Sequence, residues 1–104
     1  MDLSKMKDMM GQAKQMQEEM EAKLSSTVVE ASTGGGLVTA KMNGRKELLR
    51  LTIDPAALTA TTPSDIEMLE DLITAAINQA GRKADEVMQS NMSGLLGSLN
   101  LPGI

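Results

Sequence analysis

The sequence contains no cysteine, no histidine and no aromatic residue. Without thiols and imidazoles, a chain has no disulfides, no Ser-His catalytic pair and none of the usual zinc ligand sets. Without aromatic rings, it cannot stack bases in the way that single-strand-binding proteins do. The remaining carboxylates, hydroxyls and lysines form no convergent constellation. We therefore expect a protein that fits a reducing compartment, needs no metal or other cofactor, and is not an enzyme.

Long apolar runs are also missing, and charged residues interrupt the N-terminus at Asp2, Lys5 and Asp8. The sequence therefore predicts neither a signal peptide nor a membrane-spanning segment, and we expect a soluble cytoplasmic protein with no membrane partner. The 104 residues suffice for one domain, but the core of so small a domain is marginal in a monomer. The net charge of −4 does not by itself indicate a nucleic-acid partner.

Residues 27–53 form three alternating runs, separated by Gly34-Gly35 and Asn43-Gly44. Both dipeptides favour two-residue hairpin turns, because glycine and asparagine adopt positive φ more readily than other residues. Turns at these positions place eight apolar residues on one side: Val29, Ala31, Val38, Ala40, Met42, Leu49, Leu51 and Ile53. The segment therefore predicts a three-stranded antiparallel meander with one buried face.

The predicted register pairs Val38 with Ala31 across the first turn and with Leu49 across the second. It leaves a polar face on which three cations come together: Lys41, Lys46 and Arg50. Asp54-Pro55 ends the third strand, because proline cannot continue the hydrogen-bond ladder.

Two amphipathic helices flank the predicted sheet, with apolar residues at helical spacing over residues 3–24 and 65–92. The apolar stripe of the first helix is rich in methionine. It predicts either an adaptable binding groove or packing against the core or a second copy. The second helix begins with Thr62 as N-cap and Pro63 at its first position, or with Ser64 as the N-cap of a capping box.

The helical pattern dissolves at Gly94 into leucine, glycine and proline. Chain ends without such periodicity are commonly mobile. The expected organisation is one domain over 1–93 and a flexible tail over 94–104. The predicted fold class is α+β, with the element order α-β-β-β-α.

Both predicted helices are longer than the sheet. They would measure roughly 33 and 42 Å, whereas strands of seven or eight residues reach roughly 25 Å. The apolar stripes therefore overrun the sheet, and soluble monomers rarely expose stripes of this kind. A second copy of the chain is the simplest cover, so we expect a two-fold homodimer. The expected interface draws on both helices: Met16, Met20, Leu69, Ile73, Ala76, Ile77 and Ala80.

Taken in order, these segments resemble the YbaB/EbfC nucleoid-associated proteins. The similarity covers nearly the whole chain and rests on several stretches together: Lys14-Gln15-Met16-Gln17-Glu18, Gly35-Gly36-Leu37-Val38, Asn43-Gly44, Leu51-Thr52-Ile53-Asp54-Pro55, Met68-Leu69-Glu70-Asp71-Leu72-Ile73, Ala75-Ala76-Ile77-Asn78 and Leu101-Pro102-Gly103. The resemblance implies an intertwined homodimer of α-β-β-β-α protomers that binds double-stranded DNA in the nucleoid. It implies no enzymatic activity and no small-molecule substrate.

Two functional hypotheses follow. In the first, the dimer holds duplex DNA through its phosphates with low sequence specificity, which requires several cations on one surface but no motif. The candidate cations lie on the two helices: Lys5, Lys7, Lys14, Arg82 and Lys83. The polar sheet face, with Lys41, Lys46 and Arg50, is the rival surface. In the second hypothesis, the dimer is a non-catalytic module that recruits another protein, which the acidic net charge favours.

Overall fold

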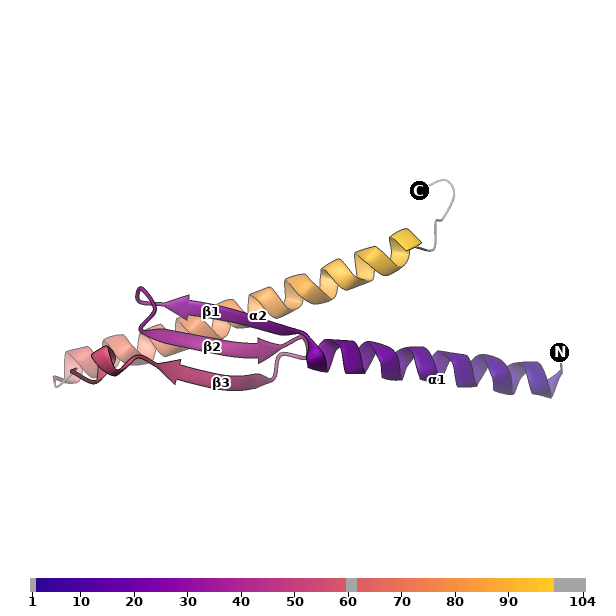
Figure 1. The fold of residues 1–104 in the computed structure, drawn as a ribbon, viewed down its shortest axis with the longest axis horizontal. Coiled ribbons are helices and arrows are strands. Elements are labelled where there is room, and N and C mark those ends of the chain that lie inside the picture. The colour runs from indigo at the N-terminus through magenta and orange to yellow at the C-terminus, as the bar shows by residue number, and fades with distance from the viewer. Residues whose placement is uncertain (1, 60–61, 99–104) are drawn as a thin grey trace.

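The computed structural model describes residues 2–59 and 62–98 of the chain. Six elements follow one another: α1 (Leu3–Ser26), β1 (Val28–Thr33), β2 (Val38–Asn43), β3 (Leu48–Ile53), the 3₁₀-helix η1 (Pro55–Thr59) and α2 (Pro63–Ser98). The strands lie in the order β1-β2-β3, and both neighbouring pairs are antiparallel. The predicted α+β fold, with its α-β-β-β-α order and three-stranded meander, is confirmed (Figure 1).

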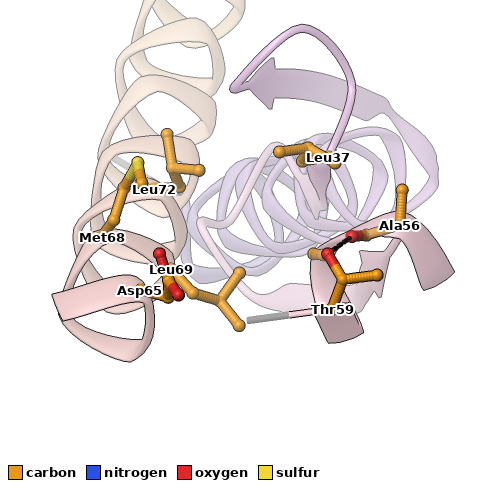
Figure 2. Close-up of a pocket in the computed structure, with 8 residues that line it drawn as sticks. Leu37, Ala56, Thr59, Asp65, Met68, Leu69 and Leu72 are labelled. Atoms are coloured by element: carbon orange, nitrogen blue, oxygen red, sulfur yellow. Dashed lines mark hydrogen bonds between the residues drawn. The ribbon is translucent and has the colours of Figure 1, made fainter. Parts of the chain in front are cut away.

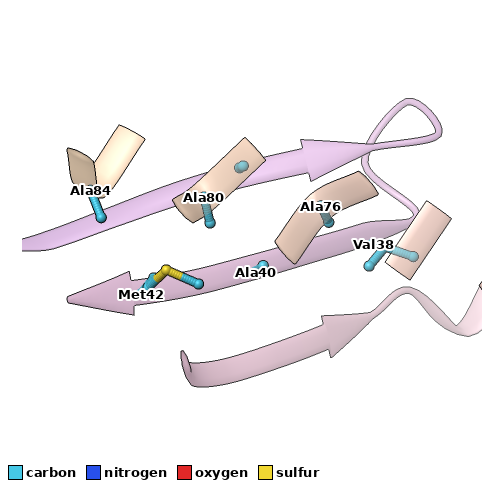
Figure 3. Packing of buried hydrophobic residues seen from close by; sticks show 7 residues of the cluster. Val38, Ala40, Met42, Ala76, Ala80 and Ala84 are labelled. Carbon is cyan, nitrogen blue, oxygen red and sulfur yellow. The ribbon is translucent and has the colours of Figure 1, made fainter. Parts of the chain in front are cut away.

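Helix α2 lies across one face of the sheet, and alanines make the closest contact. Ala76, Ala80 and Ala84 are fully buried and recur at every fourth residue, which places them on one side of the helix. Because their methyl side chains are short, the helix lies close to the strand residues that face it (Figure 3). The strand side of this core consists of four residues: Ala31, Val38, Ala40 and Met42.

Two side-chain hydrogen bonds also tie α2 to strand β1. The Thr33 hydroxyl donates to the carbonyl oxygen of Leu72 at 2.7 Å. Further along the helix, Lys83 Nζ donates to the carbonyl oxygen of Glu30, also at 2.7 Å. Helix α2 is therefore held on the sheet between these bonds and as far as Ala84, which is fully buried, and its later turns extend past the sheet.

The first hairpin has a longer loop than predicted. Thr33 pairs with Val38, so the loop comprises residues 34–37 rather than Gly34-Gly35 alone. All three glycines of this loop have positive φ, a conformation that costs glycine little. A run of three such residues makes a wider loop than a two-residue turn. The predicted pairing of Val38 with Ala31 is therefore wrong by two residues.

The second hairpin is also longer than predicted, and the Asn43 side chain explains why. Its carboxamide oxygen accepts hydrogen bonds from the backbone N–H groups of Arg45 and Glu47, both at 3.0 Å. These bonds close a loop of residues 44–47 in place of a two-residue type I′ turn. A positive φ of 64° falls on Lys46 rather than on the predicted dipeptide. The prediction of a two-residue turn with positive φ at Asn43-Gly44 is therefore wrong.

The two errors in register leave most of the predicted core face intact. Val38 pairs with Ile53, four residues beyond the predicted partner Leu49. Because side chains alternate with a period of two, shifts by an even number keep each apolar set on the same face. Leu49 is the exception, since a β-bulge interrupts the pairing opposite Lys41 and Met42 and leaves Leu49 49% exposed.

Helix α1 leaves one end of the sheet and projects away from it, and none of its residues is buried (Figure 1). The later turns of α2 project toward the same side. The molecule measures 71 × 31 × 16 Å. Its radius of gyration is 20.4 Å, whereas a compact domain of this length has about 13 Å. Both helices thus extend beyond the sheet, as their predicted lengths require.

Helix α2 begins at Pro63, as one of the two predicted N-terminal alternatives requires, and ends later than predicted. The Thr62 hydroxyl accepts a hydrogen bond from the Asp65 N–H at 3.2 Å, so Thr62 rather than Ser64 is the N-cap. The helix continues to Ser98, five residues past the predicted domain end at residue 93, through Gly94 and Gly97, each of which costs a helix only about 1 kcal/mol. The last part of the predicted flexible tail, residues 99–104, lies outside the described residues, and its flexibility stays a prediction.

Candidate nucleic-acid interface

Helix α1 is an arm that the protomer holds at one end. At its free end, Leu3 and Met10 are 75% and 70% exposed. At its attached end, the Gly44 N–H donates to the carbonyl oxygen of Leu24 at 2.8 Å, and the Leu24 side chain is half-buried. The apolar stripe that the sequence predicts therefore faces solvent along most of the arm.

The three candidate lysines of α1 are exposed, but they do not share one side of the helix. Lys7 and Lys14 are two turns apart and therefore lie on the same side. Lys5 lies about 160° around the helix from Lys7, since successive residues turn by about 100°. Within the described residues, neither ion pair of the structure involves α1. The helix thus brings Lys7 and Lys14 together and separates Lys5 from them.

The two candidate cations of α2 differ from each other. The bond from Lys83 to the Glu30 carbonyl holds that ammonium group at strand β1. Arg82 is exposed. Asp85 and Glu86 follow directly, and the described part of α2 beyond them carries no charged residue. Arg82 is therefore the more available contact of the pair.

The rival patch on the sheet is divided between its two faces. Lys41 and Arg50 are neighbours across β2 and β3, and Lys41 forms an ion pair with Glu30 at 3.7 Å. Lys46, by contrast, lies in the β2–β3 loop, and its Nζ is 3.3 Å from the carboxylate of Asp85 on α2. The prediction that all three cations gather on the polar face is wrong, because the longer loop carries Lys46 to the face that α2 covers.

A groove of about 610 Å³ separates α1 from the later turns of α2. Its lining includes Met16 and Met20 from α1, and Asn91 and Gly94 from α2. The Asn91 Nδ2 is buried and donates no hydrogen bond within the described residues. An unsatisfied amide of this kind costs about 1–3 kcal/mol, and none of the acceptors that line the groove is within hydrogen-bond reach of it. The sequence prediction missed Asn91. Its position four residues after Val87 makes it a polar residue within the apolar stripe, and this signal could have identified it.

The seven predicted interface residues divide into two groups. Ala76 and Ala80 are fully buried against the protomer's own sheet, so in this packing they offer no surface to a partner. The others keep exposed area on one helix or the other: Met16, Met20, Leu69, Ile73 and Ile77.

A smaller hollow lies between η1 and the first turns of α2 (Figure 2). Its volume of about 200 Å³ is below the roughly 300–1,000 Å³ of most ligand sites. Its walls are mainly apolar: Leu37, Ala56, Ala57, Met68, Leu69 and Leu72, with Thr59 and Asp65. In residues 2–59 and 62–98, no three metal-ligating side chains gather, and neither helix is apolar enough to cross a membrane. The surfaces that stand out are therefore the projecting helices and the groove between them.

The model of the YbaB/EbfC DNA-binding family matches residues 1–99. The chain belongs to this family. A nucleoid-associated protein of Acidobacterium capsulatum is 65% identical over 100 residues, which cover 94% of this chain and 93% of that protein. A nucleoid-associated protein of Koribacter versatilis is 51% identical over 96 residues, or 92% of each chain. The resemblance to YbaB/EbfC proteins is thereby confirmed.

A similar fold also occurs in a solved structure. An uncharacterized protein from Helicobacter pylori matches with a TM-score of 0.72 and 26% sequence identity, over 92% of this chain and 98% of that one. The match at this coverage includes the projecting helices as well as the sheet. The fold is therefore shared with this solved structure. In this chain, the two projecting helices are the candidate nucleic-acid interface.

Proposed function

We propose that this protein is a nucleoid-associated protein that binds double-stranded DNA as a homodimer, through phosphates and with low sequence specificity. The observation that carries the proposal is α1, a helix of 24 residues with no buried residue. The helix carries an apolar stripe and, beside it, lysines. The description of the family and the names of the relatives support DNA as the ligand and the nucleoid as the location.

The apolar stripe supports the homodimer. Leu3, Met6 and Met10 are 75%, 45% and 70% exposed, and soluble proteins rarely leave a stripe of this length in water. A second copy related by a two-fold axis would cover the stripe with an identical surface. The unsatisfied amide of Asn91 supports the same conclusion, because a partner helix in the groove would supply the acceptor.

Lys7 and Lys14 support contact with phosphates. They lie about 10 Å apart along one side of the arm, and a two-fold dimer presents the pair twice. Phosphate contacts position a protein on DNA without reading its sequence. Since the chain offers no aromatic wedge, intercalation between base pairs by such a ring is excluded. Lys5 and Arg82 are exposed further contacts, and Lys83 contributes least because β1 holds it.

A mobility-shift titration against salt tests DNA binding. With four phosphate contacts, the slope of log affinity against log salt should be roughly −3 to −4. The double variant Lys7→Glu/Lys14→Glu should abolish binding and keep the helix content. Lys41→Glu/Arg50→Glu, on the open sheet face, is the matched control and should lose much less. No binding by the parent even at about 20–50 mM salt, where screening is weak, would favour the protein-recruiting module instead.

Sedimentation equilibrium at micromolar concentration tests the homodimer. The parent should have twice the mass of one chain, and Ile73→Asp should dissociate or unfold it, because a buried unpaired carboxylate costs several kcal/mol. A folded parent with the mass of one chain would contradict the dimer.

A further inference from the structure

We propose that the methionines of α1 are a site of reversible oxidation by hydroperoxides, and that their sulfoxides weaken the association of the protomers. The site is defined by Met6, Met9, Met10 and Met16. The inference rests on the homodimer of the proposed function and adds a chemical control to it.

The exposure of the methionines divides them into accessible and protected groups. The chain has ten methionines and no cysteine, so the thioether is its only oxidisable sulfur. Met6, Met9 and Met10 are 45%, 62% and 70% exposed, whereas Met42 in the core is 4% exposed. These fractions are those of the free protomer, which dissociation of the proposed dimer releases. Because the oxidation of sulfur side chains follows their exposure, α1 of the free protomer should react well before the core.

The position of these methionines connects oxidation with association. Met6 and Met10 are one turn apart within the apolar stripe, and Met9 and Met16 lie beside it on the next side of the helix. A sulfoxide is polar, so each oxidation places an S=O group where α1 has to bury apolar surface. The stripe is therefore weakened along two turns, while the charges of Lys7 and Lys14 stay unchanged.

The reaction transfers one oxygen atom to sulfur. The sulfur lone pair attacks the terminal oxygen of the hydroperoxide, the O–O bond breaks, and the leaving oxygen departs as water or an alcohol with the proton. Sulfur loses two electrons and the peroxide gains them. A dithiol-dependent sulfoxide reductase reverses the change, since the dithiol becomes a disulfide and the oxygen leaves as water.

The experiment treats the full chain with hydrogen peroxide, maps the sulfoxides by mass spectrometry, and measures the dimer dissociation constant by sedimentation. We expect sulfoxides on α1 before Met42, and a rise in the dissociation constant of at least about tenfold, which corresponds to about 1.4 kcal/mol. Reduction of the sulfoxides should restore the original constant.

Matched variants separate the thioether from the apolar surface. Met6→Leu/Met10→Leu keeps the stripe apolar and should stay dimeric after peroxide. Met6→Gln/Met10→Gln imitates the sulfoxides and should dissociate without peroxide. Met68→Leu/Met92→Leu removes exposed thioethers of α2 and should leave the sensitivity of the parent unchanged.

Three results would overturn the inference. The first is an unchanged dissociation constant after complete oxidation of α1, and the second is equal sensitivity of the Met6→Leu/Met10→Leu variant. The third is oxidation of Met42 at the same rate as α1. A parent that is monomeric before peroxide is added would overturn the proposed homodimer, and with it the control of association by oxidation. This result differs from the other three because it is observed without oxidant.

Discussion

Gly44 joins the α1 arm to the sheet, and its replacement by alanine tests how closely the two are packed. Its N–H donates to the carbonyl oxygens of Leu24 and Thr27, at 2.8 and 3.1 Å. A Cβ at this position would lie 2.9 Å from the Leu24 carbonyl oxygen and 3.2 Å from the Leu24 Cα. Because these are backbone atoms, they move only if the last turn of α1 moves with them.

The expected cost of Gly44→Ala follows from this geometry. Both distances are shorter than ordinary van der Waals contacts, and forcing an extra methyl group into a packed site costs about 1–3 kcal/mol. Loss of one buried N–H bond as the loop moves away adds about 1 kcal/mol. We therefore expect a loss of about 2–4 kcal/mol in the free energy of unfolding, a large part of the roughly 5–15 kcal/mol of a typical domain.

Urea denaturation followed by far-UV circular dichroism measures the effect, at one fixed protein concentration because the stability of the proposed dimer would depend on concentration. Gly11→Ala is the matched control. A Cβ at Gly11 in α1 meets nothing within 4 Å, so this change should stabilise the helix by about 0.5–1 kcal/mol. If Gly44→Ala unfolds at the same urea concentration as the parent, the close approach of the β2–β3 loop to α1 is refuted.

Three further substitutions test the fold, each by its shift in the urea midpoint. Thr62→Ala removes the N-cap of α2 and should cost about 1 kcal/mol, and no loss would contradict the cap. Lys46→Asn should raise the free energy of unfolding by about 0.3 kcal/mol, because asparagine tolerates positive φ and the exposed ion pair of Lys46 with Asp85 contributes little to stability. A loss above about 1 kcal/mol would show that this pair matters. Ala80→Leu should cost about 1–3 kcal/mol by separating α2 from the sheet, and an unchanged midpoint would contradict the close packing.

Periodicity was sufficient to predict the elements, because the face that a strand buries depends only on alternation. Val38 and Ala40 are buried in any register that shifts by an even number of residues. The loops depended on interactions that alternation does not encode. Asn43 bonds to the loop backbone through its side chain, and Lys46 reaches Asp85 on α2. Gly44 was predicted for its φ, but its importance lies in its approach to Leu24.

The same distinction holds for the candidate site. Lys7 and Lys14 share one side of the helix, whereas Lys5 lies on another. This grouping follows from the spacing of the three lysines, so the sequence alone contained it. The bond from Lys83 to a strand carbonyl did not follow, because it depends on how α2 crosses β1. Residues on one regular element can be grouped from sequence, whereas contacts between elements require the packing.

The net charge of −4 describes the chain as a whole, but a phosphate responds to the charges near it. Fields in solution decay within about 10 Å at 0.1 M salt. Lys7 lies more than about 15 Å along α1 from the acidic run that begins at Glu18, so salt screens Lys7 from these carboxylates. Lys14 lies only one turn before Glu18 and is within reach of their field. Residues 2–14 carry Lys5, Lys7 and Lys14 against Asp2 and Asp8, an excess of one positive charge in an acidic chain, so the proposed contact with DNA is assigned to that half. In this proposal, the acidic run near the sheet would limit how far a duplex can approach along the arm.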